Sequence, residues 1–470
     1  MKNQALNPYL PSFEYVADGE PHIFGNRLYI FGSHDSFGST EFCEKDYVCW
    51  SAPVDDLSDW RYEGVIYRKN QDPKNKKGKM RMFAPDVCKG TDGRYYLYYG
   101  LSFSPSIRVA VCDEPAGRYE FYGCVKHPDG TDYGRKKGDF FPFDPGIIND
   151  NGKVFLYSGF SPAVWYLRLG IDLVSPVKGA KGNQVIELED DMLTVKSVKQ
   201  LIPGADNSAG TGFEGHEFYE ASSIRKFGDK YYFIYSSILS HELAYAVSDY
   251  PDRDFRFAGT LHSNADMQGE KACNYWGNNH GSVECINGEY YIFGHRHTFR
   301  RECNRQGVAE KLTVDENGLF RQAEMTSCGL NGKPLGIGKY EAGIACRLYS
   351  ADGAIKNTFF KNKKKSAMHP CIMQTGDDRE DNPCQFISNM RNGTVAVFRY
   401  FECNCKEIIL TAEGSGRLDI LFDLDETPVA SFEITKKAEY SAPLSFEGKK
   451  TIYIRHSGEG CADLFSLELK

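Results

Sequence analysis

The stretch ADGEPHIFGNRLYIF, residues 17–31, begins near a polar residue, passes through a short apolar segment and a Gly-Asn turn, and ends in an aromatic strand. Gly-Asn and related pairs tolerate positive φ and favour tight hairpin turns. The same pattern occurs five times along the chain, and each copy predicts one β-hairpin. The aromatic strands of the five copies span residues 27–31, 94–98, 153–157, 230–235 and 289–293.

A polar side chain that can take part in chemistry stands eight to ten residues before each aromatic strand. The strands begin 59 to 77 residues apart, somewhat more than the period of common four-stranded propeller blades. We therefore expect a five-bladed β-propeller with loops of variable length, whose equivalent strands line one central channel. Chance can place a polar residue before any one strand, but five in phase predict one shared site. These residues are Asp18, Asp86, Asp144, Glu220 and His280.

The composition agrees with an all-β protein. Aromatic residues make up 14% of the 470 residues, an enrichment typical of strands. The net charge of −8 argues against a nucleic-acid partner, because phosphate binding needs clustered positive charge. The sequence has no apolar stretch of membrane-spanning length, and its N-terminus lacks the apolar core of a signal peptide. The 15 cysteines show no metal-like spacing, so we expect reduced thiols and a cytoplasmic location.

A second domain follows the repeats. The Gly-rich segment 326–340 is typical of a linker, and the hairpin pattern stops there. Beyond it, alternating segments such as 418–424 and 451–455 are spaced by turn residues, as in a β-sandwich. The sequence therefore predicts a propeller over residues 1–325 and a jelly-roll-like sandwich over residues 341–470.

The motifs around the five polar residues resemble glycoside hydrolase family 43, which is built on five-bladed propellers. That family includes β-xylosidases, α-L-arabinofuranosidases and arabinanases. The resemblance covers roughly residues 5 to 325 with the motifs in the right order. The segments that carry it are 17–24, 83–86, 143–145, 218–223 and 279–282.

The resemblance implies a role for each of three carboxylates. Asp18 is the general base that activates water, Glu220 is the general acid that protonates the leaving oxygen, and Asp144 raises the pKa of that acid and orients it. Inverting hydrolysis needs one deprotonated and one protonated carboxyl group, about 6.5 to 9.5 Å apart, with a water between them. A third negative charge disfavours ionisation of the acid.

Two neighbouring carboxylates compete for these roles. Glu20 is a rival base, because a side chain two residues along a strand returns to the same face and because Gly19 stands where many relatives have proline. Glu217 competes with Glu220 as the acid, although Glu220 directly precedes the Ala-Ser-Ser segment that fits the family. The usual tryptophan of the second motif is Phe83 here, which keeps an aromatic floor.

Further site residues follow from the same resemblance. Phe83, Trp276 and Arg296 are expected to contact the substrate. His280 is expected to face the channel and help to hold a calcium ion that is not catalytic, directly or through waters, although calcium prefers oxygen ligands. The alternatives are a core histidine bonded to a backbone carbonyl and, for Arg296, a surface salt bridge.

Residues 341–470 resemble a degenerate family 6 carbohydrate-binding module. Tyr340-Glu341-Ala342 and the segment 462–465 match the two ends of that module, which can hold a structural calcium. Gly343 replaces a usual acidic ligand, and the domain has no tryptophan to stack on a sugar, which leaves Tyr440 as a candidate. A structural role beside the active site is therefore expected.

The sequence thus predicts an inverting exo-glycosidase that removes α-L-arabinofuranosyl or β-D-xylosyl residues from arabinoxylan-type oligosaccharides. A cytoplasmic location favours oligosaccharides over polymer. An arabinanase is the second enzymatic hypothesis and would need an open groove. A propeller that binds sugar without turnover is the hypothesis outside enzymes.

Overall fold

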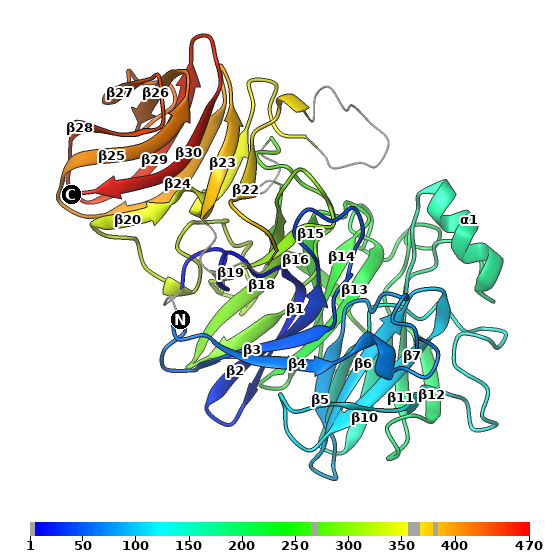
Figure 1. The fold of residues 1–470 in the computed structure, drawn as a ribbon. Helices are drawn as coiled ribbons and strands as arrows, with labels where there is room; N and C mark the ends of the chain where they lie inside the picture. Colours follow the sequence, from blue (N-terminus) through cyan, green and yellow to red (C-terminus); the bar gives the residue numbers. More distant parts are fainter. Residues whose placement is uncertain (1–4, 266–270, 356–366, 379–383) are drawn as a thin grey trace.

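The computed structural model describes residues 5–265, 271–355, 367–378 and 384–470. It is an all-β protein, as the sequence predicts, and α1 (Trp165–Val174) is its main helix within the described residues. Figure 1 shows two groups of sheets, with the C-terminal strands gathered at one end of the molecule and α1 projecting at the other side. No helix in the described ranges has the length and hydropathy needed to span a membrane.

Residues 16–311 form five antiparallel sheets, in each of which the strands lie in sequence order. Four of these sheets have four strands and the fifth has three. Their strands are β1 (Val16–Phe24), β2 (Arg27–His34), β3 (Tyr47–Pro53) and β4 (Arg61–Tyr67); β5 (Asp86–Lys89), β6 (Tyr95–Leu101), β7 (Ser104–Cys112) and β8 (Glu120–Cys124); β9 (Gly146–Asp150), β10 (Lys153–Ser158), β11 (Gln184–Leu188) and β12 (Val195–Gln200); β13 (Phe218–Phe227), β14 (Lys230–Ser237), β15 (Glu242–Ser248) and β16 (Arg256–Ser263); β17 (Val283–Ile286), β18 (Glu289–His297) and β19 (Arg305–Lys311).

The five predicted hairpins are confirmed, because each aromatic strand is the second strand of its sheet and pairs with the first. The turns between them need the left-handed conformation that Gly and Asn tolerate: φ is 64° at Gly25 and 52° at Asn287. The aromatic side chains of these strands are buried between neighbouring sheets, in separate apolar clusters. Local turn chemistry and burial of aromatic rings therefore build each sheet.

The first strands of neighbouring sheets contact one another. β1 contacts β5, β5 contacts β9, β9 contacts β13, and β17 contacts β1. Ser223 of β13 donates a hydrogen bond from its Oγ to the Oγ of Ser282, the residue directly before β17, at 2.7 Å. The five first strands thus lie around a common centre, and polar residues at their starts are brought together.

Two more antiparallel sheets follow and share one hydrophobic core. The first contains β20 (Gly338–Glu341), β22 (Cys371–Gln374), β23 (Gln385–Met390), β25 (Cys405–Gly414), β28 (Ala438–Phe446) and β30 (Ala462–Leu469); the second contains β21 (Arg347–Tyr349), β24 (Val395–Glu402), β26 (Gly416–Leu421), β27 (Ala430–Ile434) and β29 (Lys449–Ser457).

The segment predicted as a linker packs on these C-terminal sheets. Cys328 and Leu335 belong to their core, and the backbone amide of Ser327 donates to the carbonyl of Arg399. Asp378 reaches the first group of sheets, where its carboxylate accepts from the Phe37 amide at 3.1 Å and pairs with Lys45. The segment after β22 therefore holds the β2–β3 loop in place.

Candidate active site

A cavity of about 610 Å³ lies where the first strands meet, and each of the five sheets, or the segment that leads into it, contributes side chains to the cavity. Three carboxylates and a histidine from equivalent places in the repeats line it: Asp18, Asp144, Glu220 and His280. The fifth residue of the predicted set, Asp86, is buried outside this lining, where its carboxylate accepts from the Ile147 amide at 2.8 Å and contacts His22 at 2.6 Å. Asp86 therefore ties sheets together.

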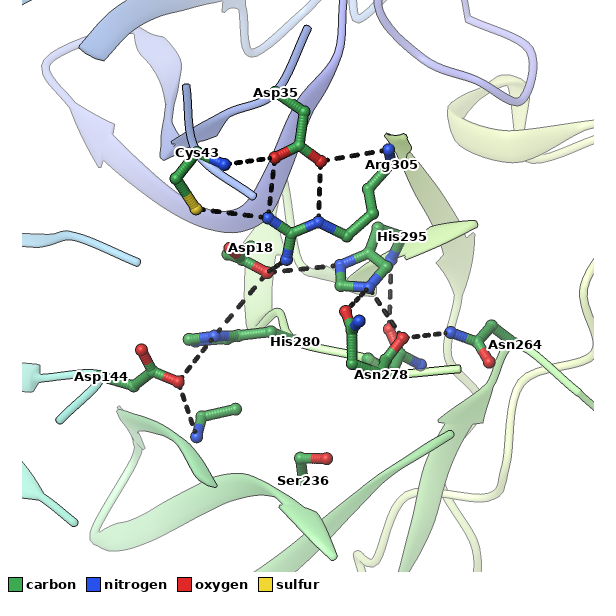
Figure 2. A network of polar contacts seen from close by, with 12 residues as sticks. Asp18, Asp35, Cys43, Asp144, Ser236, Asn264, Asn278, His280, His295 and Arg305 are labelled. Carbon is green, nitrogen blue, oxygen red and sulfur yellow. Dashed lines mark hydrogen bonds and ion pairs between the residues drawn. The ribbon is translucent and has the colours of Figure 1, made fainter. Parts of the chain in front are cut away.

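Asp18 lines the cavity, and its carboxylate contacts Arg305, His295 and His280 (Figure 2). It lies in β1 at a bulge with φ of 54°, a conformation that turns the chain locally and is uncommon for residues other than glycine. Arg305 donates from Nη1 to its Oδ1 at 2.7 Å. Burial opposes the charge, but Arg305 and His280 outweigh that effect and lower the pKa of Asp18 to about 2.

Arg305 is a cavity-lining residue that the sequence analysis missed. Asp35 grips its guanidinium with two hydrogen bonds, from Nε to Oδ2 at 2.8 Å and from Nη2 to Oδ1 at 3.0 Å. The Cys43 amide donates to the same carboxylate at 2.9 Å (Figure 2). Arg305 begins β19, the third strand of its sheet, so the first-strand repeat that led to the other residues gave no signal for it.

The pKa values of Glu220 and Asp144 are raised, whereas that of Asp18 is lowered. Burial and then the negative charge of Asp144 raise the pKa of Glu220 to about 8. Burial also raises the pKa of Asp144 to about 7, with the charge of Asp18 adding to the rise and His280 opposing it. Asp144 accepts a hydrogen bond from the amide of Ala221, the residue after Glu220, at 3.3 Å. Arg305 therefore favours the ionised form of Asp18, whereas burial and the charge of Asp144 favour the protonated form of Glu220.

His280 lies among three carboxylates. Its Nδ1 is 3.7 Å from Asp144 Oδ2 and 4.0 Å from Asp18 Oδ1, and its Nε2 is 3.8 Å from Glu20 Oε1. Burial opposes protonation, but Glu20, Asp144 and Asp18 raise the pKa of His280 to about 9. Both ring nitrogens face carboxylates, so the ring fits an imidazolium cation better than a direct calcium ligand, which must present an unprotonated nitrogen.

The two rival carboxylates lie outside the cavity lining. Glu20 forms an ion pair with Arg225 at 2.8 Å and accepts a hydrogen bond from Ser223 Oγ at 3.0 Å. The charge of Arg225 therefore balances that of Glu20. Glu217 accepts from Ser208 Oγ at 2.8 Å. The first contact joins two sheets and the second lies within the segment before β13, so Asp18 and Glu220 fit the roles of base and acid better than Glu20 and Glu217.

Of the three residues predicted to contact the substrate, Phe83 lines the cavity, whereas Trp276 and Arg296 do not. Phe83 lines the cavity, where its ring lies 5.2 Å from that of Phe143. Trp276 is not part of the lining and packs its ring against His241. Arg296 is buried away from the cavity and donates to the carbonyl of Gly343 at 2.6 Å, so it joins the two groups of sheets. Its expected role in substrate binding has no support from this position.

One carboxyl group that favours the ionised form and one that favours the protonated form lie in the same cavity. Hydrolysis by general acid and general base catalysis requires such a pair. Residues 20–320 match the family described as Glycosyl hydrolases family 43. A xylosidase/arabinosidase from Thermoclostridium stercorarium is 45% identical over 485 aligned residues, which cover 100% of this chain and 99% of the relative. The chain belongs to glycosyl hydrolase family 43 and is a glycoside hydrolase.

Solved structures show the same fold. An arabinoxylan arabinofuranohydrolase from Bacillus subtilis, in complex with cellotetraose, aligns with a TM-score of 0.50 at 17% identity over 98% of this chain and 96% of its own. A β-xylosidase/α-arabinofuranosidase from a compost microbial metagenome, in complex with xylotriose and described as calcium-free, aligns with a TM-score of 0.52 at 24% identity over 68% of this chain and 97% of its own.

Proposed function

We propose that this protein is an inverting exo-acting xylosidase and arabinofuranosidase that releases β-D-xylosyl and α-L-arabinofuranosyl residues from arabinoxylan-type oligosaccharides. The observation that carries the proposal is that Asp18, Asp144 and Glu220, which come from three different repeats, line one cavity. The pKa of Asp18 is lowered there and that of Glu220 is raised, as a base and an acid require. The full-length relative is named a xylosidase/arabinosidase, which supports the choice of pentoses.

In the proposed reaction, Asp18 accepts a proton from a water that attacks the anomeric carbon of the sugar. Glu220 donates its proton to the glycosidic oxygen as the bond between that oxygen and the anomeric carbon breaks. The products are a pentose of inverted configuration and a shortened saccharide, after which Asp18 returns its proton to Glu220 through solvent. Asp144 keeps Glu220 protonated before each turnover, because its negative charge opposes ionisation of the acid.

The five sheets of residues 16–311 serve as the blades of a five-bladed propeller in this proposal. The sequence order of strands within each sheet and the contacts among the five first strands support it. We retain the proposed boundaries of 1–325 for the catalytic domain, 326–340 for the linker and 341–470 for a β-sandwich resembling a family 6 module. The common core of the two C-terminal sheets supports that last assignment.

The C-terminal domain has a structural role rather than a role in binding sugar. Asp378 holds the loop that carries Phe42 and Cys43 into the cavity, and Tyr440 turns its hydroxyl to the carbonyl of Lys436 at 2.7 Å. A cytoplasmic location is part of the proposal, since all 15 cysteines are free thiols. The proposal also includes a calcium ion near His280, bound through waters. This ion takes no part in the catalytic steps.

The test compares hydrolysis of p-nitrophenyl β-D-xyloside, p-nitrophenyl α-L-arabinofuranoside and xylobiose by the wild type and three variants. Asp18→Asn is expected to lose activity on every substrate, because no group remains to activate water. Glu220→Gln is expected to lose about 10²–10⁴-fold on xylobiose and far less on the aryl glycosides, whose leaving group needs little protonation. Glu20→Gln is the matched control for the base.

Two results would contradict the proposal. Full turnover by Asp18→Asn together with loss in Glu20→Gln would transfer the role of base to Glu20. Binding of xylobiose by the wild type without any turnover of the three substrates would favour the non-catalytic hypothesis.

A further inference from the structure

The helix α1 leaves most of its apolar side chains uncovered at the rim of the cavity. Tyr166 is 58% exposed, and it lines the cavity together with Val164 and Leu167. Trp165 and Leu173 are 68% and 78% exposed on the same helix, but they are not part of the cavity lining. The helix therefore presents one group of apolar side chains to the active-site cavity and another to solvent.

The segment directly before α1 contacts β13, the strand that carries the proposed general acid Glu220. The Ser161 amide donates to the carbonyl of Tyr219 at 2.8 Å, and Tyr219 directly precedes Glu220 in β13. The ring of Phe160 lies 5.5 Å from Tyr219 and 5.0 Å from Phe143. An ion pair of 3.6 Å between Arg168 and Asp206 holds the helix itself. The wall that leads from Glu220 to α1 is thus a built part of the cavity.

The side of a glycosidase cavity next to the general acid receives the leaving group, because the acid must reach the glycosidic oxygen. From this we infer that Phe160, Val164, Tyr166, Leu167 and Tyr219 form the leaving-group subsite of this enzyme, a specificity-determining surface that takes a saccharide or aryl group through its apolar face. The inference rests on the proposed function, since it assumes that Glu220 is the acid.

The chemistry of this wall determines what it recognises. Its five side chains are uncharged aromatic or aliphatic groups, and all five line the cavity. Aromatic rings pack against the C–H face of a sugar or against an aryl ring, and such contacts depend weakly on the pattern of hydroxyl groups. The subsite therefore favours leaving groups with an extended apolar face over small ones and discriminates little among sugars of similar shape.

The experiment measures kcat/KM for xylotriose, whose leaving group is a disaccharide, and for β-D-xylosyl fluoride, whose leaving group is one atom. Tyr166→Ala is expected to lower the ratio of the two values by roughly tenfold, the loss of about one stacking contact. Tyr166→Phe keeps the ring and should restore most of the ratio. Leu173→Ser, on the same helix but outside the cavity lining, is the matched control, and thermal denaturation checks the folding of each variant.

Four outcomes would overturn the inference. Equal losses on both substrates in Tyr166→Ala would show a general disturbance of the site, and no loss on either would show that Tyr166 does not contact the leaving group. An equal fall of the ratio in Leu173→Ser would assign the effect to the helix as a whole. A wild type that hydrolyses neither substrate would instead overturn the proposed function and this inference with it.

Discussion

Arg305 and Asp18 are joined by a hydrogen bond of 2.7 Å between Nη1 and Oδ1, although they are 287 residues apart in the sequence. Asp35 fixes the guanidinium from the other side in a two-point contact, so the arginine is oriented before substrate arrives. The result is a buried carboxylate that stays ionised in spite of its burial. If Asp18 is the base, as proposed, this relationship sets the acidic limit of catalysis.

Replacing Arg305 by methionine should move the acidic limb of the pH profile. Without the guanidinium, the pKa of Asp18 rises from about 2, so activity is lost at a higher pH as the solution is acidified. Arg305→Lys keeps the charge but loses the two-point contact with Asp35, and a smaller shift is expected. The measurement is kcat/KM against pH from 3 to 9 on an aryl pentoside. An acidic limb that stays in place in Arg305→Met would contradict this account.

Asp144→Asn should move the alkaline limb in the acidic direction. Above its own pKa of about 7 Asp144 is ionised, and its charge holds the pKa of Glu220 near 8. The neutral amide removes this repulsion, so Glu220 loses its proton at a lower pH. The same pH series measures the change, with Glu217→Gln as control because Glu217 lies outside the cavity lining. A limb that moves to higher pH would show that Asp144 acts in another way.

Glu220→Gln should make the protein more stable at pH 8 than the wild type. A glutamate whose pKa rises from 4.5 to about 8 on folding destabilises the folded state as the pH rises above 4.5, because the folded state resists losing its proton. We expect a melting temperature about 2 °C higher or more for the variant at pH 8. The difference should vanish at pH 4, where the side chain is protonated in both states. A constant difference across this range would contradict the linkage.

Arg296→Met should lower stability and leave the substrate affinity of the folded enzyme unchanged. The side chain donates to the carbonyl of Gly343 and to the side chains of Gln306 and Gln385, so its loss leaves buried acceptors without these bonds. The cost is about 1–3 kcal/mol of unfolding free energy. Denaturant unfolding measures the cost, and KM measured well below the melting temperature is the control. A large rise of KM in the variant would instead support the prediction that Arg296 contacts the substrate.

Chelation should leave kcat unchanged. The positive charge among Asp18, Asp144 and Glu20 comes from His280, whose two nitrogens face those carboxylates. His280→Asn should then lower kcat, because the three carboxylates lose their common counter-charge. Turnover before and after treatment with EDTA, with added calcium as the second arm, measures the metal dependence. Loss of kcat on chelation and its recovery with calcium would assign the charge to a bound ion.

Several features of the fold and site were predictable because they depend on residues close together in sequence. A Gly or Asn turn next to an aromatic strand is sufficient to define a hairpin, and five such hairpins in phase predicted the positions of Asp18, Asp144, Glu220 and His280. The all-β class followed from the same repeats. The choice between Asp18 and Glu20 did not follow, because both lie on one strand and their different partners come from β18, β19 and β13.

The sequence by itself determined where each hairpin begins and which residue types stand at the start of its first strand, because turn conformation and strand alternation are local properties of the backbone. Only the tertiary structure decided that Arg305 rather than Arg296 faces the cavity, that His280 lies among three carboxylates, and that α1 borders the side of the cavity that carries Glu220. These relationships depend on burial and on charges from sheets distant in sequence, and both effects arise only when the sheets pack together.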